Sequence, residues 1–402
     1  MAISIKEALE LIELQKLSYK KECVPLQDAL GRVCYKEYKA TIDLPGFDNS
    51  AMDGFAVKLA DEGKEVKITA TIFAGQNVEI ELEEGGAVKI MTGARLPKGT
   101  EAIVPIEDVE YLGESVVLPK KIKKGSHMRY QGEDVTKESV VVDRGETLSA
   151  YKIALLASQG YSCIEVFKRP KVAVFATGSE LQMHYETIQG SQIYNSNTPA
   201  FLARCEELGC DVSFIGKVED SPQAIKDAIE SALDADLIVT SGGVSVGEAD
   251  FTKEAFKAMQ METLFSKIDI KPGKPTTLGK IGDTFVLNLP GNPLAAALNF
   301  EIFGRFLINR LKGRKDPYHR PIITKAKEKI TLKPGRDTVI PGFFDGEHFE
   351  AFEKRAPGMV NPAARMNGFV IASKEATTLS KQLRFIPLWD FYSEEFVEII
   401  SK

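Results

Sequence analysis

Three glycine-rich loops carry most of the residues in this sequence that can contact a charged ligand. They span residues 177–180, 241–250 and 289–293, and each directly follows an apolar run typical of a buried strand. Ligands of open parallel sheets bind beyond the carboxyl ends of the strands, so these loops can converge on one ligand. Their glycines let backbone N–H groups approach an anion, and the following helices point their positive ends at the same place. The loops therefore favour a phosphate site, although glycine and proline can also simply turn the chain.

The loop residues that we predict to contact the ligand are Thr177, Gly178, Ser179, Ser241, Gly242, Gly243, Ser245, Gly247, Pro290, Gly291, Asn292 and Pro293. No loop matches the GxGxxG or GxxxxGK(S/T) pattern in its proper place, so a dinucleotide-binding fold or a P-loop finds no support. The phosphate prediction therefore depends on the position of the loops alone.

A short basic turn, residues 271–275 with the sequence KPGKP, lies between the second and third loops. Two prolines and a glycine stiffen it, and its two ammonium groups suit a clamp on a phosphate or another oxyanion. A charged surface turn would have a similar sequence, but solvated turns seldom need two prolines. We therefore predict that Lys271 and Lys274 contact an anion.

Two irregular segments stand out in the first half of the chain. Residues 45–57 are rich in turn formers yet keep Phe47, Met52 and Phe55, which indicates a hinge or a binding loop. Exposed apolar side chains on such a loop usually mark an interface, so we expect a symmetric dimer. Residues 127–135 place an arginine and two acids around a glycine, which by itself indicates a salt-bridged surface turn.

A folded scaffold must position these residues, and its clearest pattern lies in residues 171–311. Four apolar, strand-like runs alternate there with helical segments, which predicts a parallel sheet buried on both faces. Thr198 before Pro199 and Ser221 before Pro222 are predicted to cap helices. The predicted fold class is therefore multidomain α/β plus β, centred on a parallel-sheet α/β domain.

Short alternating runs predict β structure on both sides of this domain: an inserted β-rich domain and a small C-terminal β-domain. A helix is predicted at about residues 4–16, where Ser4 and Glu7 form a capping box, and another between Ser149 and Gly160. We expect four domains: residues 1–44 with 141–169 as an N-terminal helical or linker domain, 45–140 as the inserted β-rich domain, 170–315 as the α/β domain, and 316–402 as the C-terminal β-domain.

Length and composition exclude several protein classes. The chain has 402 residues, more than one hydrophobic core usually supports, and 44% of them are apolar, as in globular proteins. A net charge of −6 gives no overall attraction to nucleic acid or anionic lipid, so we expect neither as a partner. Without CxxC or HExxH spacings, a zinc enzyme finds no support. Without a signal peptide or membrane span, we expect a cytoplasmic protein.

Seven motifs spread over about 250 residues together resemble one known family. PGFDNSAMDGFAV, MTGARLP, HMRYQGEDV, VFATGSEL, TSGGVSVGEADFTK, KPGKPT and LPGNP look, in this order, like the motifs of molybdopterin molybdenumtransferases, which include the gephyrin E domain. The resemblance implies an α/β molybdopterin-binding domain and an enzyme that inserts molybdate into adenylylated molybdopterin, with Mg2+, releasing AMP. It also implies an elongated homodimer whose pterin site faces the partner subunit, and contacts with the adenylyltransferase and with molybdoenzymes.

The resemblance assigns roles to individual residues. It implies catalytic acids at Asp53, Asp134, Glu180 and Asp250, metal ligands at Asp220 and Asp250, and substrate contacts at Thr92, Arg129, Lys271, Lys274, Pro290 and Pro293. The chemistry agrees, because molybdate oxo groups leave as water and need proton donors, while Mg2+ takes one or two carboxylates with phosphate oxygens. Glu219 can take the place of Asp220 in this match.

Two other functions fit parts of the sequence. The α/β domain also resembles molybdopterin adenylyltransferases, although those consist of a single α/β domain, and the gephyrin relationship allows a non-enzymatic scaffold. One departure concerns the C-terminal GMVNPAARMNG stretch, where the family often carries serines and this chain has Asn361 and Pro362. These two positions therefore offer no hydroxyl group for a contact to substrate.

Overall fold

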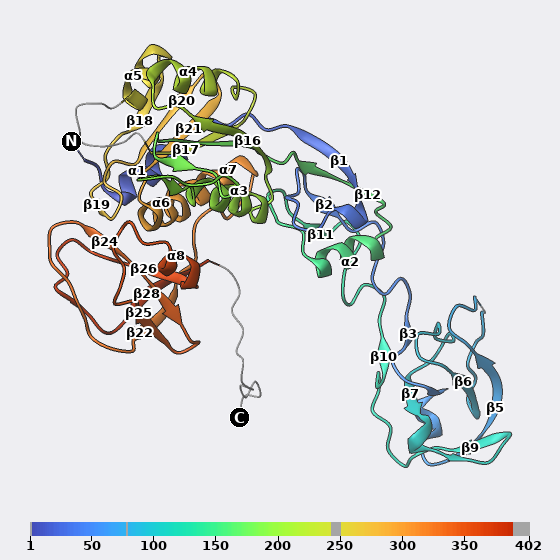
Figure 1. Ribbon diagram of the computed structural model, residues 1–402. Coiled ribbons are helices and arrows are strands. Elements are labelled where there is room, and N and C mark those ends of the chain that lie inside the picture. The colour runs from blue at the N-terminus through green and yellow to red at the C-terminus, as the bar shows by residue number, and fades with distance from the viewer. Residues whose placement is uncertain (1, 78, 243–250, 389–402) are drawn as a thin grey trace.

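The computed structural model describes residues 2–77, 79–242 and 251–388. Its chain forms an elongated molecule with a central sheet covered by helices, a barrel beside it, and a distal β-sheet carried away from both on two narrow ribbons (Figure 1). The described residues contain no helix that is long and apolar enough to cross a membrane.

The central sheet has six strands in the order β16 (Asp211–Val218), β13 (Lys171–Thr177), β17 (Leu237–Ser241), β21 (Thr284–Leu289), β20 (Thr277–Ile281) and β18 (Glu262–Phe265). The first four strands are parallel, as predicted, but β20 runs antiparallel to both of its neighbours, β21 and β18, so the prediction of a wholly parallel sheet was wrong at this edge. A tight turn between Ile281 and Thr284, with Gly282 at a φ of 60°, forces β20 and β21 into a hairpin.

Helices cover both faces of the central sheet. One face packs against α1 (Ile5–Glu13), α3 (Asn197–Glu207), α6 (Pro293–Asn299), a π-helical stretch (Phe300–Gly304) and α7 (Arg305–Leu311); the other packs against α4 (Pro222–Glu230) and α5 (Phe251–Ala258). The helix α1 joins this core through Ala8 and Ile12, although its sequence lies at the opposite end of the chain from α7. The sheet therefore has the two apolar faces that its sequence pattern requires.

Helix starts follow the predicted caps with one exception. Ser4 and Glu7 form the capping box of α1, and Ser221 accepts a hydrogen bond from Ala224 N at the start of α4. Thr198 was predicted to cap the helix before Pro199, but it lies inside α3 and donates its N–H to Asn195 Oδ1 at 3.1 Å. An asparagine side chain can accept hydrogen bonds from the unpaired N–H groups of a first helical turn as well as a hydroxyl can. The side chain that does so here is Asn195, three residues before the predicted cap.

The distal sheet and the two ribbons come from the first 167 residues. The distal sheet has the order β7 (Ala102–Pro105), β4 (Gly54–Val57), β6 (Gly86–Ile90), β5 (Glu65–Ile72), β9 (Ser115–Val117) and β8 (Glu110–Tyr111), with the small pair β3 (Asn49–Ser50) and β10 (Met128–Arg129) beside it. The ribbons pair β1 (Lys21–Pro25) with β12 (Cys163–Phe167) and β2 (Tyr38–Lys39) with β11 (Val140–Val142), next to α2 (Ala150–Ser158). Ser149 caps α2 and Gly160 follows it, as predicted.

The C-terminal region closes into a small barrel. Around it run β24 (Asp337–Phe344), β25 (His348–Ala351), β22 (Ile322–Ala326), β28 (Leu383–Pro387) and β26 (Gly368–Ala372), which pairs back to β24; β19 (Ile270–Lys271), β23 (Ile330–Thr331), β27 (Thr378–Leu379) and α8 (Asn361–Arg365) lie outside this ring. Because β19 belongs to the loop before β20, the basic KPGKP turn is attached to the barrel as well as to the central sheet.

Candidate functional site

A cavity of about 750 Å³ opens at the carboxyl end of the parallel strands. The loops after β13, β17 and β21 meet there, as the strand order requires. Of the predicted site residues, its lining includes Thr177, Gly178, Glu180, Asp220, Ser241, Gly242, Pro290, Gly291, Asn292 and Pro293. The structure therefore brings together most of the described residues that the α/β sequence contributed to the prediction.

Close backbone contacts hold the three loops together. Gly242 has a φ of 101°, and a Cβ there would lie 2.4 Å from Thr177 O, so only glycine fits. Its N–H donates to Leu289 O at 3.2 Å, which joins the second loop to the third. Asn197 donates from Nδ2 to Gly291 O at 2.9 Å and lies 3.4 Å from Ser241 Oγ. The glycines serve here to pack one loop against another.

Two carboxylates, Glu180 and Asp220, share the cavity. Partial burial, followed by the charge of Glu180, raises the pKa of Asp220 above its ordinary value. The Glu180 carboxylate folds back over its own loop, since a Cβ at Gly178 would lie 3.0 Å from both of its oxygens. Two like charges that share one cavity favour uptake of a proton or a cation.

The basic turn lies at the edge of the cavity. Pro275 belongs to its lining, whereas Lys271 and Lys274 are exposed beside it. Asn299 holds the turn from α6, because its Nδ2 donates to Pro272 O at 3.1 Å and presses against Gly273 so closely that a Cβ there would lie 1.8 Å away. The turn is therefore fastened to the sheet core, and within the described part of the chain neither of its ammonium groups forms an ion pair.

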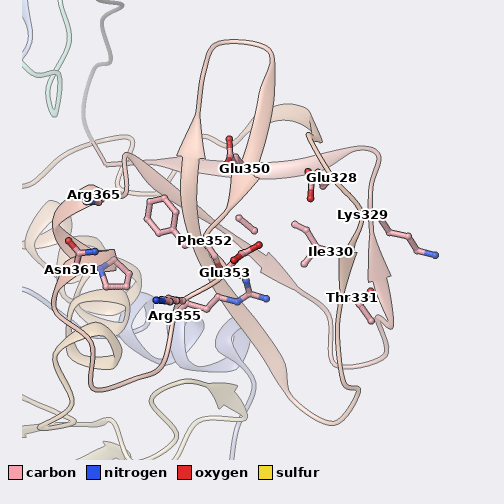
Figure 2. A pocket seen from close by; sticks show the side chains of 13 residues that line it. Glu328, Lys329, Ile330, Thr331, Glu350, Phe352, Glu353, Arg355, Asn361 and Arg365 are labelled. Carbon is pink, nitrogen blue, oxygen red and sulfur yellow. Dashed lines mark hydrogen bonds between the residues drawn. The ribbon is translucent and has the colours of Figure 1, made fainter.

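A C-terminal loop forms the opposite wall. Gly358 and Val360 line the cavity, and Pro357 O accepts a hydrogen bond from Leu294 N at 3.0 Å. Asn361 and Pro362 instead line a second cavity of about 470 Å³ on the barrel side, together with Arg355 and Arg365 (Figure 2). The stretch from residue 358 to residue 362 thus borders both cavities.

The remaining predicted acids lie in the distal part of the molecule. Asp53 accepts hydrogen bonds from Thr92 N at 2.7 Å and Thr92 Oγ1 at 2.8 Å. The backbone bond first, and then the hydroxyl, lower the pKa of Asp53 below its ordinary value. Arg129 pairs with Asn49 where β3 and β10 lie side by side, and Asp134, five residues further along the chain, is exposed. These four residues share one region, but within one chain they do not meet the cavity (Figure 1).

Several predicted residues are not part of the lining, and several lining residues were not predicted. Ser179 is exposed and does not line the cavity, and Gly243, Ser245, Gly247 and Asp250 lie outside the described residues. The lining residues that the sequence reasoning missed are Leu181, Ile193, Tyr194, Asn195, Ser196, Asn197, Pro275, Gly358 and Val360. The polar run from 194 to 198 was the available signal, but it was taken only as a helix start.

The described residues contain no group of three or more histidine, cysteine, aspartate or glutamate side chains able to hold a metal ion. Asp220 nevertheless suits Mg2+, which commonly takes one or two protein carboxylates and completes its shell with water and phosphate oxygens. Partial burial, and then the charge of Glu180, disfavour the unpaired Asp220 anion, and a bound divalent cation would relieve both effects.

Two family models match the chain. Residues 3–160 match the model described as the MoeA N-terminal region (domain I and II), and residues 173–310 match the model of a probable molybdopterin binding domain. Among solved structures, a molybdopterin biosynthesis MoeA protein from Pyrococcus horikoshii covers 97% of this chain and 100% of its own, with a TM-score of 0.81 and 29% identity.

Named relatives agree over nearly the whole length. The molybdopterin molybdenumtransferase of Haemophilus influenzae is 34% identical over 382 residues, which cover 92% of this chain and 94% of the relative. The protein of the same name from Staphylococcus aureus is 33% identical over 368 residues, covering 85% of this chain and 87% of the relative. The similarity therefore includes the distal sheet, the central sheet and most of the barrel.

Proposed function

Because the chain belongs to the molybdopterin molybdenumtransferase family, it is a transferase of molybdenum cofactor biosynthesis, and we propose that it inserts molybdenum from molybdate into adenylylated molybdopterin and releases AMP. The convergence of three glycine-containing loops on one cavity carries this proposal. A cavity of about 750 Å³ lies within the range that holds cofactor-sized ligands.

Within the cavity, Glu180 delivers protons to the molybdate oxo groups that leave as water. Thr177, Ser241 and Asn292 border the space beyond the strand ends, where neutral donors hold the pterin and its phosphates. Lys271 and Lys274 stand at the edge and draw in the anionic substrates, since an ammonium group stabilises charge that a low-dielectric cavity would otherwise reject.

Asp220 would hold Mg2+, with Asp250, which lies outside the described residues, as the second ligand. Bound there, the ion would supply charge neutralisation at the phosphoanhydride. Glu180, beside Asp220, keeps its own carboxyl free for proton transfer.

A second subunit completes the site. Asp53, Thr92, Arg129 and Asp134 share the distal region, and the family resemblance gives them roles in the same reaction as Glu180. A homodimer in which the distal region of one subunit reaches the cavity of the other satisfies both conditions. Sedimentation at micromolar concentration should give a dimer, and a monomer would contradict this arrangement.

Mixed dimers test the shared site directly. Glu180→Gln and Asp53→Asn each inactivate a different half of the site, so a mixed dimer of the two variants contains one intact site. Activity should therefore reappear on mixing after reversible dissociation, whereas neither variant alone recovers. No recovery from dimers proven to be mixed would place Asp53 and Glu180 in separate functions.

We also propose the domain division at residues 1–44 with 141–169, 45–140, 170–315 and 316–402, and a cytoplasmic location. Limited proteolysis should cut first near these boundaries.

The reaction itself is tested with purified protein, adenylylated molybdopterin, molybdate and Mg2+. The expected products are AMP and molybdenum cofactor, and mass spectrometry of small molecules that copurify should detect adenylylated molybdopterin. Consumption of ATP with unmodified molybdopterin would instead indicate an adenylyltransferase and would overturn the proposal.

A further inference from the structure

A groove of positive charge lies at the far end of α3 from the substrate cavity. Asn197 lines the cavity at the start of this helix, and Glu207 lines the groove at its end, about 15 Å away at 1.5 Å per residue. Two hollows of about 360 and 350 Å³ form the groove and share Glu207, Leu208 and Lys312. The groove is thus one continuous feature, with Lys312 at its middle.

Cations dominate both hollows. The first adds Arg32, Lys168 and Arg169 to Lys312, and the second adds Arg305, Arg314 and Arg320. The carboxylates in the lining are Glu207 and Asp316, and each already binds an arginine, since Glu207 lies 2.8 Å from Arg204 Nη1 and Asp316 lies 3.0 Å from Arg314 Nη2. In a chain of net charge −6, this excess of cations is local.

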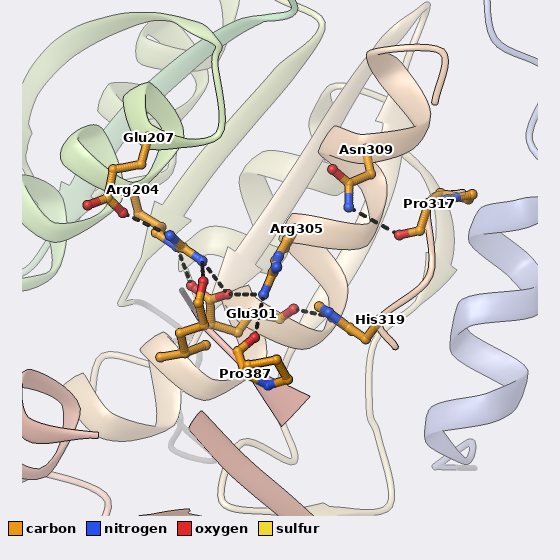
Figure 3. A network of polar contacts seen from close by, with 9 residues as sticks. Arg204, Glu207, Glu301, Arg305, Asn309, Pro317, His319 and Pro387 are labelled. Carbon is orange, nitrogen blue, oxygen red and sulfur yellow. Dashed lines mark hydrogen bonds and ion pairs between the residues drawn. The ribbon is translucent and has the colours of Figure 1, made fainter. Parts of the chain in front are cut away.

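Nearby acids neutralise only part of this charge. Arg32 forms an ion pair with Glu22. Glu301 is bound mainly by Arg204, through Nε at 2.7 Å and Nη2 at 3.1 Å, and Arg305 Nη1 lies 3.6 Å from it (Figure 3). Asp234 and Asp236, behind Arg169, are held by Lys171 through its Nζ and its backbone N–H. Among residues 2–77, 79–242 and 251–388, no ion pair engages Lys168, Arg169, Lys312 or Arg320.

The surroundings of Lys312 and His319 indicate the same positive field. Burial lowers the pKa of Lys312, and Arg314, Arg169 and Arg32 lower it further. Burial, and then Arg305, lower the pKa of His319 to about 4, so it is neutral at pH 7. The Lys312 ammonium donates to Leu208 O at 2.6 Å, which leaves two of its N–H groups for a ligand.

We propose that this groove binds a compound carrying two or more linked phosphates, with Lys312 at its centre. Guanidinium groups match phosphate oxygens in pairs, and the two hollows let successive phosphates meet different arginines. An acidic peptide fits less well, because hollows of this size give a main chain little room.

Binding there would act on the connection between regions. Lys168 and Arg169 lie between β12, which leads to the distal sheet, and β13, whose carboxyl end forms the substrate cavity. A polyphosphate that contacts both Arg169 and Lys312 fixes the end of the β1–β12 ribbon against the central sheet. The groove therefore regulates the placement of the distal sheet without touching the substrate.

Calorimetric titration of the whole protein with inorganic tripolyphosphate tests the proposal. Lys312→Gln keeps an N–H donor for Leu208 O but removes the charge, and it should weaken binding by about tenfold or more. Lys123→Gln, at an exposed lysine in the distal region, is the matched control and should change affinity less than twofold. Lys274→Ala should also leave this binding intact, which separates the groove from the substrate cavity.

Other probes decide the ligand class. ATP should bind about as well as tripolyphosphate if the phosphates are what the groove recognises, and orthophosphate should bind at least tenfold more weakly. Equal affinity for orthophosphate, tighter binding of penta-glutamate, or wild-type affinity in Lys312→Gln would each overturn the proposal. Should Lys312→Gln not fold, Arg169→Gln with Arg320→Gln, both at exposed side chains, gives the same test.

Hydrogen exchange tests the effect on the connection. Tripolyphosphate should slow exchange of the backbone amides at residues 168–171 in the wild-type protein and leave them unchanged in Lys312→Gln. Protection confined to the substrate loops would show that the anion binds there and would contradict the groove.

Discussion

Asp220 in the substrate cavity and Asp53 in the distal region are both exposed aspartates, yet their surroundings shift their pKa values in opposite directions. Asp220 stands near the charge of Glu180 and has no hydrogen-bond donor to stabilise its anion among the described residues. Asp53 receives two donors from Thr92. The cavity therefore favours capture of a proton or a cation, whereas the distal site presents a fixed negative charge.

The difference separates two uses of the same side chain. A carboxyl with a raised pKa takes up a proton or a metal ion more readily than a free aspartate, and a carboxylate fixed by donors orients its surroundings. The resemblance implied a catalytic role for Asp53 and metal binding for Asp220, and the pKa values of these two carboxyls are shifted in opposite directions. Substitutions around Asp220 and substitutions around Asp53 should therefore have effects of different kinds.

The largest effect is expected from Glu180→Gln. The amide keeps the shape of the side chain but can neither donate a proton nor carry a charge, so molybdate insertion should fall by about 10²-fold or more. Binding of adenylylated molybdopterin and the melting temperature should change little. Wild-type turnover in this variant would place the chemistry elsewhere and remove the basis of the comparison.

The basic turn should show the next largest effect. Lys271→Ala and Lys274→Ala should each weaken binding of adenylylated molybdopterin or molybdate by at least about tenfold, because a charge-assisted hydrogen bond contributes about 1.5 to 3 kcal/mol. The melting temperature should stay unchanged, since Asn299 still holds the turn through Pro272 O. Unchanged affinity for both ligands would show that these lysines are only surface charges.

A smaller effect is expected in the distal region. Thr92→Val removes the hydroxyl donor to Asp53 but keeps the backbone N–H donor, so the pKa of Asp53 should rise toward its ordinary value. Turnover should fall by about two- to tenfold, the range of a single hydrogen bond. Thr92→Ser, which keeps the hydroxyl, is the control and should behave as wild type.

The smallest change is a titration shift that isolates the cause at Asp220. In Glu180→Gln the pKa of Asp220 should fall but stay above its ordinary value, because burial, the larger cause, remains. Carboxyl carbon NMR in the wild type should show Asp220 titrating above, and Asp53 below, a free aspartate. The lowered pKa of Asp53 stabilises the folded state above the unfolded-state pKa, and this contribution is lost as pH falls through the lowered pKa. The raised pKa of Asp220 stabilises the folded state below the unfolded-state pKa, and that contribution is lost as pH rises through the raised pKa.

Features of the fold and the site could be predicted where residues close together in the sequence determine them. The sequence correctly predicted the helix caps Ser4, Ser149 and Ser221 and the four apolar runs of the central sheet, because neighbouring residues determine helix caps and buried strands. The hairpin of β20 and β21 was missed, since a fully buried antiparallel strand has the same apolar pattern as a parallel one. The lining residues Tyr194 and Asn197 were missed because a polar run before a helix equally indicates a cap.

The sequence by itself determined the family, the order of the elements and the loops that end the parallel strands, since a strand's carboxyl end and its following glycine are local properties. Only the tertiary structure decided that Glu180 faces Asp220, that Thr92 fixes Asp53, and that Arg169 and Arg305 gather around Lys312. Three of these pairings join residues far apart along the chain: Thr92 and Asp53 by 39 positions, Glu180 and Asp220 by 40, and Arg169 and Lys312 by 143. Electrostatic shifts depend on distances in space and on burial, and neither can be read from residues that are far apart along the chain.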